Sequence, residues 1–586
     1  GRPPKSQPTF SPAVPTPIPA RVPVAATILN SGSTGVQASM RSRISTRSLG
    51  REQPLTRSAS ITSTRRVAGS SSPMAWRRRA DRLRRRKPKE EPGGNRISAL
   101  PDDLLLLVLR LLDTRAALGA GVLSRRWAGL PRKLDALDLR VSDVLPPRYQ
   151  RWLLRYRDIY SKGTFALYRP RIGRHEFMPN MTRYERRAMR AFTSSVEGLL
   201  AAGARRRVSR LRLEFFTTHN TGCIDRLISQ AIDDWGVDDL EVIARPTFRQ
   251  QTVHAFPSHG LCDEPGASRL QSLKLGCCVI PPRLHRFGAL TRLILQDVAE
   301  SPPSSYENVL YSCPQLQVVH LNSCLCDRGE VMLLDAPDSQ IRELVIDNCV
   351  IGSVWLRDLP NLERLASMGT KLCFEADSVP CLRQWHLARR LGIEVEGFHQ
   401  WLRQHLELDP FVEHTRDITN LIIRFTGPDR WIVPSSSPSL LLPNLRRLLV
   451  ADVPSSWDVA WPRALLEMAP ALESFHIHIA SCTEEPNEEI SWQPTKLRQH
   501  RLKEFVMAGF DGADRQIYLV KFVMGVCTAL RRVAMFRNGH AQDKGHWDWE
   551  MVTQEHSWTE EEKDATLNQI MGVVSSTAAP VQVVFG

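Results

Sequence analysis

The 586-residue sequence has no apolar run long enough to cross a membrane, and its cysteines are sparse. A membrane-spanning helix needs about 20 consecutive apolar residues, and Arg110 interrupts even the leucine-rich stretch at residues 100–112. The 12 cysteines are scattered along the chain, and no secretory signal is evident. This pattern favours reduced thiols over a disulfide scaffold. We therefore expect an intracellular protein without a membrane segment.

The sequence also lacks the short motifs that mark common catalytic and cofactor sites. It has no G-x-x-x-x-G-K-[ST] phosphate loop, no H-E-x-x-H metal motif and no G-x-S-x-G elbow. His476 and His478 alternate with apolar residues along a predicted strand, so we expect them to be exposed on a sheet face. These absences favour a protein that binds without catalysis and needs no cofactor.

Basic residues are concentrated at the start of the chain. Residues 1–94 hold 19 Lys or Arg against 4 Asp or Glu, which leaves 59 against 58 in the rest. This arm is rich in Pro, Ser and Gly and poor in large apolar residues, a composition typical of disorder. The run RRRADRLRRRKPK at residues 77–89 fits a nuclear localisation signal, a nucleic-acid contact, a solvated tail or part of a transit peptide. Because the chain opens with Gly, Met74 is a plausible initiator.

The stretch LPDDLLLLVLRLL at residues 100–112 predicts a helix that is apolar on two faces. Pro101 suits a first helical turn, and Asp102 and Asp103 favour the positive end of the helix dipole. At helical spacing the apolar residues fall into two groups, which are Leu105, Val108, Leu109 and Leu112, and Leu104, Leu107 and Leu111. The short segment that follows can cover one of these faces. We therefore expect the other face to contact another protein.

Two elements of this region resemble the F-box, a three-helix motif that docks on the Skp adaptor of cullin-RING ubiquitin ligases. They are Leu100-Pro101-Asp102 and Leu123-Ser124-Arg125-Arg126-Trp127. The resemblance implies that adaptor contacts come from the apolar residues Leu100, Pro101, Leu104, Leu107, Val108, Leu123 and Trp127. Two features depart from the family, since Gly119 and Gly121 each lower helix propensity by roughly 1 kcal/mol and Pro131 stands where the family often has Trp. These departures favour a weaker affinity for the adaptor.

From Val208 onward a short sequence pattern, the repeat phrase, recurs. It has apolar residues at its first, fourth and sixth positions. It begins at Val208, Val237, Leu270, Leu290, Leu316, Ile341, Leu382, Leu445, Leu472, Leu502 and Leu530. A spacing of about 20–30 residues is the period of leucine-rich repeats, in which each unit supplies a strand and buries its apolar face by stacking on its neighbours. The widest gap, residues 388–417, contains FHQWLRQHL and predicts an inserted helix.

Three cysteines share one position in the predicted repeats. Cys278, Cys324 and Cys349 each stand three residues after the last apolar anchor of a repeat. A small side chain fits inside the turn there, and free Cys behaves as a small hydrophobe. A zinc site would need paired C-x₂-C knuckles, which the sequence lacks. We expect these cysteines to fill repeat turns and not to bind metal.

The carboxyl end predicts a cap. Residues 502–536 resemble the terminal region of plant F-box and leucine-rich-repeat proteins that is often called FBD-like, with a strand, a Gly-containing turn, a helix and a strand. The apolar stripe of that helix is Ile517, Val520, Val523 and Met524. Ser557 and Glu560 form a predicted capping box before a polar helix, and VQVVF at residues 581–585 can end the sheet.

Together these patterns predict an α/β protein in which a small three-helix F-box is followed by an irregular leucine-rich-repeat solenoid. The expected boundaries are a disordered basic arm at 1–94, the F-box at 95–140, a helical linker at 141–206, the solenoid at 207–500, and FBD-like repeats with a cap at 501–586.

The resemblance implies the substrate-recognition subunit of an SCF-type cullin-RING ubiquitin ligase, located in the nucleus, the cytoplasm or both. Such a subunit is non-catalytic, because its F-box binds the Skp adaptor and its repeats hold a target protein. The alternative is a solenoid that binds nucleic acid or protein without any link to ubiquitin transfer. The near-neutral charge after residue 94 argues against nucleic acid. A third possibility, an enzyme with an unrecognised active site, is opposed only by the missing motifs.

Overall fold

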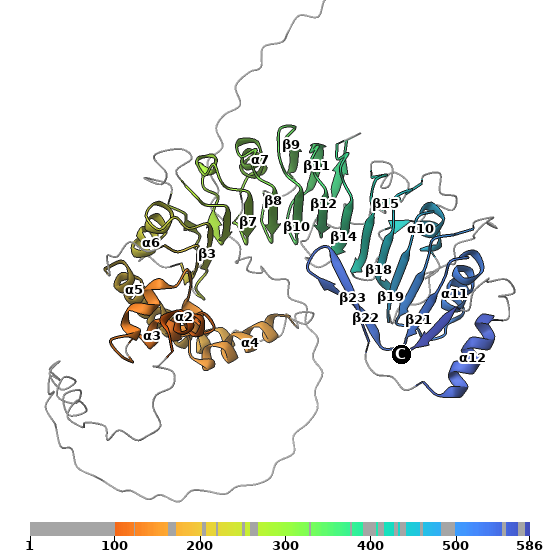
Figure 1. Cartoon of the computed structure of the whole chain (residues 1–586), viewed down its shortest axis with the longest axis horizontal. Coiled ribbons are helices and arrows are strands. Elements are labelled where there is room, and N and C mark those ends of the chain that lie inside the picture. The colour runs from red at the N-terminus through yellow and green to blue at the C-terminus, as the bar shows by residue number, and fades with distance from the viewer. Residues whose placement is uncertain are drawn as a thin grey trace, which may run out of the picture. The chain divides into compact units, whose positions relative to one another are not determined.

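The computed structural model describes residues 100–121, 123–161, 172–201, 207–217, 221–248, 252–257, 268–299, 301–326, 330–375, 378–390, 406–407, 415–426, 432–433, 441–456, 461–481, 498–553, 558–571 and 581–586 (Figure 1). The chain divides into residues 1–92 and 93–586, and every described residue belongs to the second unit. The predicted basic arm lies outside these ranges, as do residues 398–405 of the predicted inserted helix FHQWLRQHL, whose last residue, Leu406, begins a short strand.

The first described elements form a small helical subdomain. They are α2 (Asp102–Arg110), α3 (Thr114–Ala120) and the 3₁₀ helix η1 (Trp127–Lys133). The Asp113 side chain caps α3 by accepting a hydrogen bond from Ala116 N at 2.8 Å. Their apolar side chains share a hydrophobic core of Leu105, Leu109, Ala117, Ala120, Trp127, Leu130 and Leu134. The third element is a 3₁₀ helix that contains Pro131, a residue that cannot donate an α-helical hydrogen bond.

Two longer helices lie in the predicted helical linker, after the short 3₁₀ helix η2 (Val141–Val144). They are α4 (Pro147–Ser161) and α5 (Ile172–Ala201). Buried Glu185 of α5 accepts hydrogen bonds at 2.9 Å from Tyr149 Oη of α4 and from Phe248 N beyond the second repeat. Burial raises the pKa of this carboxyl group. The side chain therefore ties the linker to the repeats.

A single parallel sheet dominates the described residues and contains fifteen strands. In spatial order they are β1 (Ala136–Arg140), β2 (Arg210–Phe216), β3 (Asp239–Arg245), β5 (Ser272–Gly276), β7 (Arg292–Gln296), β8 (Val318–Asn322), β10 (Glu343–Asp347), β12 (Arg364–Met368), β14 (Gln384–Arg390), β16 (Asn420–Thr426), β18 (Arg447–Pro454), β19 (Ser474–Ala480), β20 (Glu504–Ala508), β21 (Arg532–Phe536) and β24 (Gln582–Phe585). Strand neighbours in space are therefore mostly neighbours in sequence, as stacked repeats require.

Alternate side chains of each strand face the core, as the period of two dictates. In β3, for example, Leu240, Val242 and Ala244 are buried, whereas the residues between them are half-buried. The anchors of successive strands pair in register, as when Leu240 lies beside Leu211 and Leu273. One continuous hydrophobic core results, which runs from Leu137 to Ile570.

Most of the other elements are short and lie in the connections between sheet strands (Figure 1). The helices among them are α6 (Gly222–Asp233), η4 (Leu284–Arg286), α7 (Pro303–Ser312) and α10 (Arg463–Met468). Small sheets form from β4 (His254–Ala255) with β6 (Cys278–Val279), from β9 (Val331–Asp335), β11 (Ser353–Asp358) and β13 (Leu372–Phe374), and from β15 (Leu406–Glu407) with β17 (Ile432–Val433).

The residue directly after a strand adopts a left-handed backbone in several consecutive repeats. These residues are Cys277, Asp297, Ser323, Asn348 and Gly369, with φ between 49° and 86°. The first four N–H groups donate to the last strand carbonyl of the next repeat, as Asp297 N does to Asn322 O at 2.9 Å, and Gly369 N donates to Ala388 O within β14. The three predicted turn cysteines follow directly and are buried. Cys278 Sγ lies 3.2 Å from Gly276 O and Cys349 Sγ lies 3.2 Å from Leu321 O, so the prediction that they fill repeat turns is confirmed.

The C-terminal region ends the sheet and adds a cap. Here α11 (Asp514–Val526) connects β20 to β21, and its predicted stripe is buried. A polar helix, α12 (Glu560–Met571), precedes the final strand β24. The capping box is two residues later than predicted, because Thr559 Oγ1 accepts from Glu562 N at 3.2 Å and Glu562 Oε2 accepts from Thr559 N at 3.1 Å. Ser557 lies outside the described residues.

All eleven predicted repeat strands are present, and β24 forms where the sheet was expected to end. The other three strands of the main sheet, β1, β12 and β16, were not among the predicted repeats. In β12 the third anchor is Ser367, which is fully buried although polar. Strand β16 follows the widest gap in the pattern, and its buried apolar anchors are Ile418, Leu421 and Ile423. Within the described part of the chain, every helix is too short or too polar to span a membrane. The same residues include no group of three or more His, Cys, Asp or Glu side chains placed to bind a metal ion.

Gly509, directly after β20, offers a test of the turn geometry. Its φ is 74°, and a Cβ atom would lie 2.0 Å from Ile479 O of the neighbouring repeat. We expect Gly509→Ala to lower the free energy of unfolding by about 2–4 kcal/mol, because the backbone strain adds to a steric clash. Urea denaturation followed by circular dichroism measures the effect.

The matched control is Gly512→Ala. Gly512 has a φ of 84°, but no atom lies within 4 Å of the position that a Cβ atom would take, so this variant should lose about 1–2 kcal/mol from strain alone. Equal losses in the two variants would show that the close approach to Ile479 is not a packing constraint.

Candidate functional site

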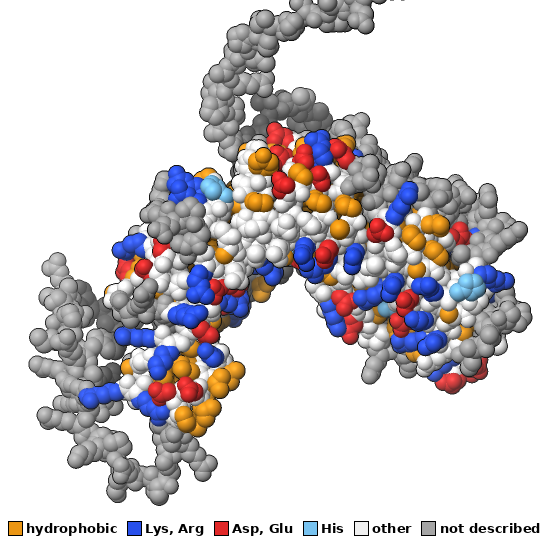
Figure 2. All heavy atoms as spheres, turned by 45° about the horizontal axis from the view of Figure 1, so that its top comes forward, with side chains coloured by type: hydrophobic (Ala, Val, Ile, Leu, Met, Phe, Trp, Pro, Cys, Tyr) orange, Lys and Arg blue, Asp and Glu red, His pale blue; other side chains and the backbone are white. Residues whose placement is uncertain are grey.

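Helix α2 carries an exposed apolar surface. Leu105 and Leu109 are its buried residues, and both are at most 1% exposed. The exposed large apolar side chains on its other sides, directly after it and on the turn before η1 are Leu104 (45% exposed), Leu107 (52%), Val108 (37%), Leu111 (87%), Leu112 (44%) and Leu123 (74%). We call these six residues the α2 surface. Figure 2 shows hydrophobic side chains gathered at this end of the described chain, beside acidic and basic ones.

The buried face of α2 is narrower than predicted. Of the four residues that helical spacing groups together, Leu105 and Leu109 are buried, whereas Val108 and Leu112 are exposed. The small subdomain has only α3 and η1 to cover α2, and its core takes up Leu105 and Leu109, with Leu106 packed partly against it. Leu104, Leu107 and Val108 of the helix therefore stay exposed.

The predicted adaptor contacts divide into exposed and buried positions. Pro101, Leu104, Leu107, Val108 and Leu123 are exposed, and Leu100 is half-buried. Trp127 is 7% exposed and packs in the core of the helical subdomain. The prediction that Trp127 offers an adaptor contact is therefore corrected, because its ring fills the space between the three helices.

Polar contacts join the helical subdomain to the main sheet. Thr114 Oγ1 accepts a hydrogen bond from Asp138 N of β1 at 2.8 Å, and Arg115 Nη1 donates to Asp143 O at 2.8 Å. Arg110 also forms an ion pair with Asp135 at 3.2 Å. Because β1 is the first strand of the sheet, α3 satisfies part of an edge that would otherwise be open.

The face of the main sheet opposite the core is lined by charged side chains. We call it the outward face. Its ion pairs link neighbouring repeats, for example Arg212 with Glu241 at 3.2 Å and Arg364 with Glu343 at 2.6 Å. Further pairs join Arg210 to Asp239, Arg245 to Glu214 and Arg532 to Glu504. Several of its arginines therefore already have carboxylate partners.

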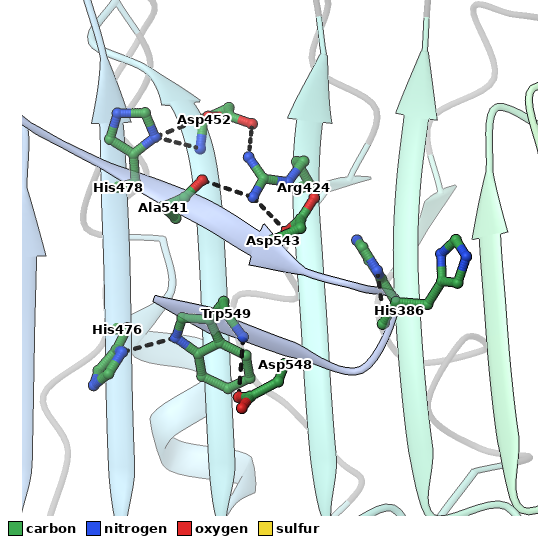
Figure 3. A network of polar contacts seen from close by, with 10 residues as sticks. His386, Arg424, Asp452, His476, His478, Ala541, Asp543, Asp548 and Trp549 are labelled. Carbon is green, nitrogen blue, oxygen red and sulfur yellow. Dashed lines mark hydrogen bonds and ion pairs between the residues drawn. The ribbon is translucent and has the colours of Figure 1, made fainter. Parts of the chain in front are cut away.

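A β-hairpin covers part of the outward face. Its antiparallel strands are β22 (Gly539–Lys544) and β23 (Asp548–Thr553), and Figure 3 shows it crossing the sheet strands. Ala541 and Trp549 are buried against Ile422, Leu449 and Ala451 of β16 and β18. The hairpin has a weak signal in the sequence. Its buried apolar residues are Ala541 and Trp549, too few to form a clear strand pattern, and no repeat phrase marks it.

Arg424 of β16 is a central contact of the hairpin (Figure 3). Its guanidinium group pairs with Asp452 at 2.6 Å and with Asp543 of the hairpin at 2.7 Å, and it donates to Ala541 O at 2.9 Å. His478 Nδ1 lies 2.8 Å from the same Asp452. Although burial opposes ionisation of Asp452, the hydrogen bonds from His478 and Arg424 hold its pKa below the usual value.

Trp549 forms the second anchor. Its Nε1 donates to His476 Nδ1 at 2.8 Å, and His476 Nε2 lies 3.2 Å from Glu504 Oε2. In this arrangement Nδ1 accepts from the indole N–H, which leaves Nε2 to donate to Glu504. The hydrogen bond with His476 lowers the pKa of Glu504 to about 2. Arg447 lies 4.4 Å from the Trp549 ring centroid and pairs with Asp548 at 2.8 Å.

The hairpin turn reaches the middle of the sheet. His386 Nδ1 of β14 donates to His546 O at 3.0 Å, and the His546 ring meets the His320 ring edge to face at 5.5 Å. Burial lowers the pKa of His386 and of His546. The expectation that His476 and His478 are exposed is therefore wrong, since they lie partly buried beside or beneath the hairpin.

These features define a leucine-rich-repeat protein with an exposed helical surface at one end of its sheet. The family model described as "At1g61320/AtMIF1, LRR domain" matches residues 201–543, which is more than half of the chain. The chain belongs to this plant leucine-rich-repeat family. The matched range includes the sheet strands from β2 to β21 and all but the end of β22, and it does not include α2, α3 or η1.

Two curated relatives come from Arabidopsis thaliana. A "Putative F-box protein At3g29830" is 24% identical over 335 residues, which cover 55% of this chain and 58% of that protein. An "F-box/FBD/LRR-repeat protein At5g18770" is 32% identical over 96 residues, which cover 16% and 20%. The chain thus spans 58% or less of the length of these relatives. Their names agree with the resemblances to F-box, leucine-rich-repeat and FBD sequences.

The hairpin should loosen as the pH falls below about 6.5, the ordinary pKa of histidine. Because the pKa values of His386 and His546 are lowered in the closed state, their contribution is present above the ordinary pKa and is lost as the pH falls through the lowered one. Asp543 and Arg424 face His386, while His320, Glu343, Asp347 and Asp543 face His546. Hydrogen exchange of residues 539–553, corrected for intrinsic rates at pH 7.5 and 5.5, measures the change.

The control for this pH dependence is His386→Asn, which keeps a donor for the turn carbonyl but cannot titrate. Its hairpin should show a smaller change between the two pH values. Equal protection of the wild-type hairpin at pH 7.5 and 5.5 would contradict the assignment of these histidines as neutral anchors.

Proposed function

We propose that the protein is a non-catalytic substrate-recognition subunit of an SCF-type cullin-RING ubiquitin ligase. In this proposal the helical subdomain docks on the Skp adaptor and the repeats bind a target protein, in the nucleus, the cytoplasm or both. Transfer of ubiquitin is promoted by the high effective concentration of the bound target. The observation that carries the proposal is the α2 surface, where six large apolar side chains are exposed on a helical subdomain of two short α-helices and one 3₁₀ helix.

The size and composition of the α2 surface support docking on a protein. Contiguous exposed apolar patches mark interaction sites in soluble proteins, and leucines at helical spacing suit a helix that packs against a partner. The subdomain keeps its own core of seven buried side chains, so docking does not require α2 to unpack. The F-box names of the two relatives point to the same role.

The outward face supports protein recognition better than nucleic-acid binding. Arg210, Arg212 and Arg245 of the first repeats each form an ion pair with a carboxylate of the same face. Phosphate binding would have to break these pairs, whereas nucleic-acid affinity depends on basic groups that neutralise phosphates. Mixed charges beside partly buried apolar residues are typical of protein interfaces.

The test of adaptor docking is Leu104→Asp in the full chain. A carboxylate at the interface should reduce copurification of Skp adaptor and cullin from plant cells at least about tenfold, since burying an unpaired charge costs several kcal/mol. Because Leu104 is 45% exposed in the free protein, the unfolding midpoint should stay near that of the wild type. Immunoprecipitation with quantitative mass spectrometry measures the loss.

The matched control is Leu154→Asp on α4, which introduces the same change at a leucine that is 57% exposed but lies outside the α2 surface. It should retain adaptor and cullin. Recovery of both proteins with Leu104→Asp at the wild-type level, or failure to recover them with the wild type, would overturn the proposed docking.

A further inference from the structure

The hairpin is held by few buried groups. Among its described strand residues, Ala541 and Trp549 are buried, while most of the others are exposed. A two-stranded hairpin has little stability of its own. Its position therefore depends on its contacts with the outward face, and such weakly buried elements open more readily than the core.

The surface beneath the hairpin has the composition of a binding site. Ile422, Leu449 and Ala451 form its apolar floor, and Arg424 and Arg447 stand beside that floor. An apolar centre with arginine is common where interfaces have their strongest contacts. Two buried polar atoms of this surface, Arg424 Nε and His386 Nε2, have no hydrogen-bond partner among the described residues. The hairpin thus leaves two hydrogen-bonding atoms of the site without a partner among the described residues.

The hairpin shows which chemistry this surface accepts. Asp543 pairs with Arg424 and Asp548 pairs with Arg447. Trp549 fills the apolar centre, donates to His476 and lies beside the Arg447 guanidinium. The matching ligand is a polypeptide segment with two carboxylates that flank or precede an aromatic side chain.

We propose that the outward face of β14, β16, β18 and β19 is a binding site for an acidic, tryptophan-containing segment of a partner protein, and that the hairpin occupies this site as an internal competitor. The inference deepens the proposed function, because it rests on target recognition by the repeats and names the chemistry of the segment that they bind. A partner that also supplies an acceptor for Arg424 Nε or a donor for His386 Nε2 gains contacts that the hairpin does not make.

The covalent link gives the hairpin a competitive advantage. Tethered binding acts at an effective concentration in the millimolar range, so a free segment of similar affinity cannot displace it. Weakening the anchors should remove this advantage and open the site to a ligand in solution. The release variant therefore combines Asp543→Lys with Asp548→Lys, which places positive charges opposite Arg424 and Arg447.

The probe is a fluorescent peptide of residues 538–553, closed into a ring by a disulfide between cysteines added at its two ends. We expect it to bind the full-length release variant at least about tenfold more tightly than the wild type, because the internal competitor is lost. Fluorescence anisotropy measures the affinity. Hydrogen exchange of residues 539–553 should be faster in the release variant than in the wild type, while strands β18 to β20 stay protected.

Three controls define the site. Glu550→Lys reverses a hairpin carboxylate that pairs with Lys544 within the hairpin, and it should behave as the wild type. Adding Arg424→Ala to the release variant should abolish peptide binding, as should Trp549→Ala in the peptide. Equal affinity for the wild type and the release variant, no peptide binding by a variant whose hairpin exchanges rapidly, or a hairpin that stays protected in the release variant would each overturn the proposal. None of these outcomes bears on adaptor docking through the α2 surface.

Discussion

Each strand of the main sheet can bury its apolar side chains only against the units on either side of it. This constraint produces the continuous core from Leu137 to Ile570 and the in-register pairing of the strands. The left-handed residue after a strand serves the same stacking, since its N–H bonds to a carbonyl of the next repeat, as at Asp297 and Asn348. The same turns explain the positions of Cys278, Cys324 and Cys349, because the space inside each turn admits a small side chain.

A stacked sheet has two edge strands, and different elements of the chain lie beside each of them. At the first end Thr114 of α3 accepts a hydrogen bond from β1, so the helical subdomain meets the sheet edge as well as presenting the α2 surface. At the other end α12 precedes β24, and Trp558 Nε1 donates to Gly586 O at 3.1 Å. Docking and recognition are thus mechanically linked in the proposal, because the docking element is attached to the first strand of the recognition surface.

The outward face is the part of the sheet that repeat stacking leaves free. Over the early strands it is lined by ion pairs such as Arg212 with Glu241, and over the later strands it is covered by the hairpin. The covered part contains His386, His476 and His478, with Arg424 and Arg447 beside them. These histidines form hydrogen bonds beside or beneath the hairpin. Burial lowers the pKa of His386, so closure of the hairpin is sensitive to protonation in a way that an apolar contact would not be.

The sequence by itself determined the repeat architecture, since an apolar residue at every second strand position and a recurring period leave few other ways to bury the anchors. It also indicated the exposed surface near Leu104 and Leu107 and the turn position of Cys278, because these depend on local spacing. The strand at Arg364–Met368 does not fit the repeat pattern, because Ser367 replaces an apolar anchor. The inward position of Trp127 was not predicted, because it depends on how the three helices pack together. Only the tertiary structure placed the hairpin on the outward face. Its partners, such as Arg424 with Asp543 and His476 with Trp549, lie more than 70 residues apart, and no local pattern encodes contacts between side chains so far apart in the chain.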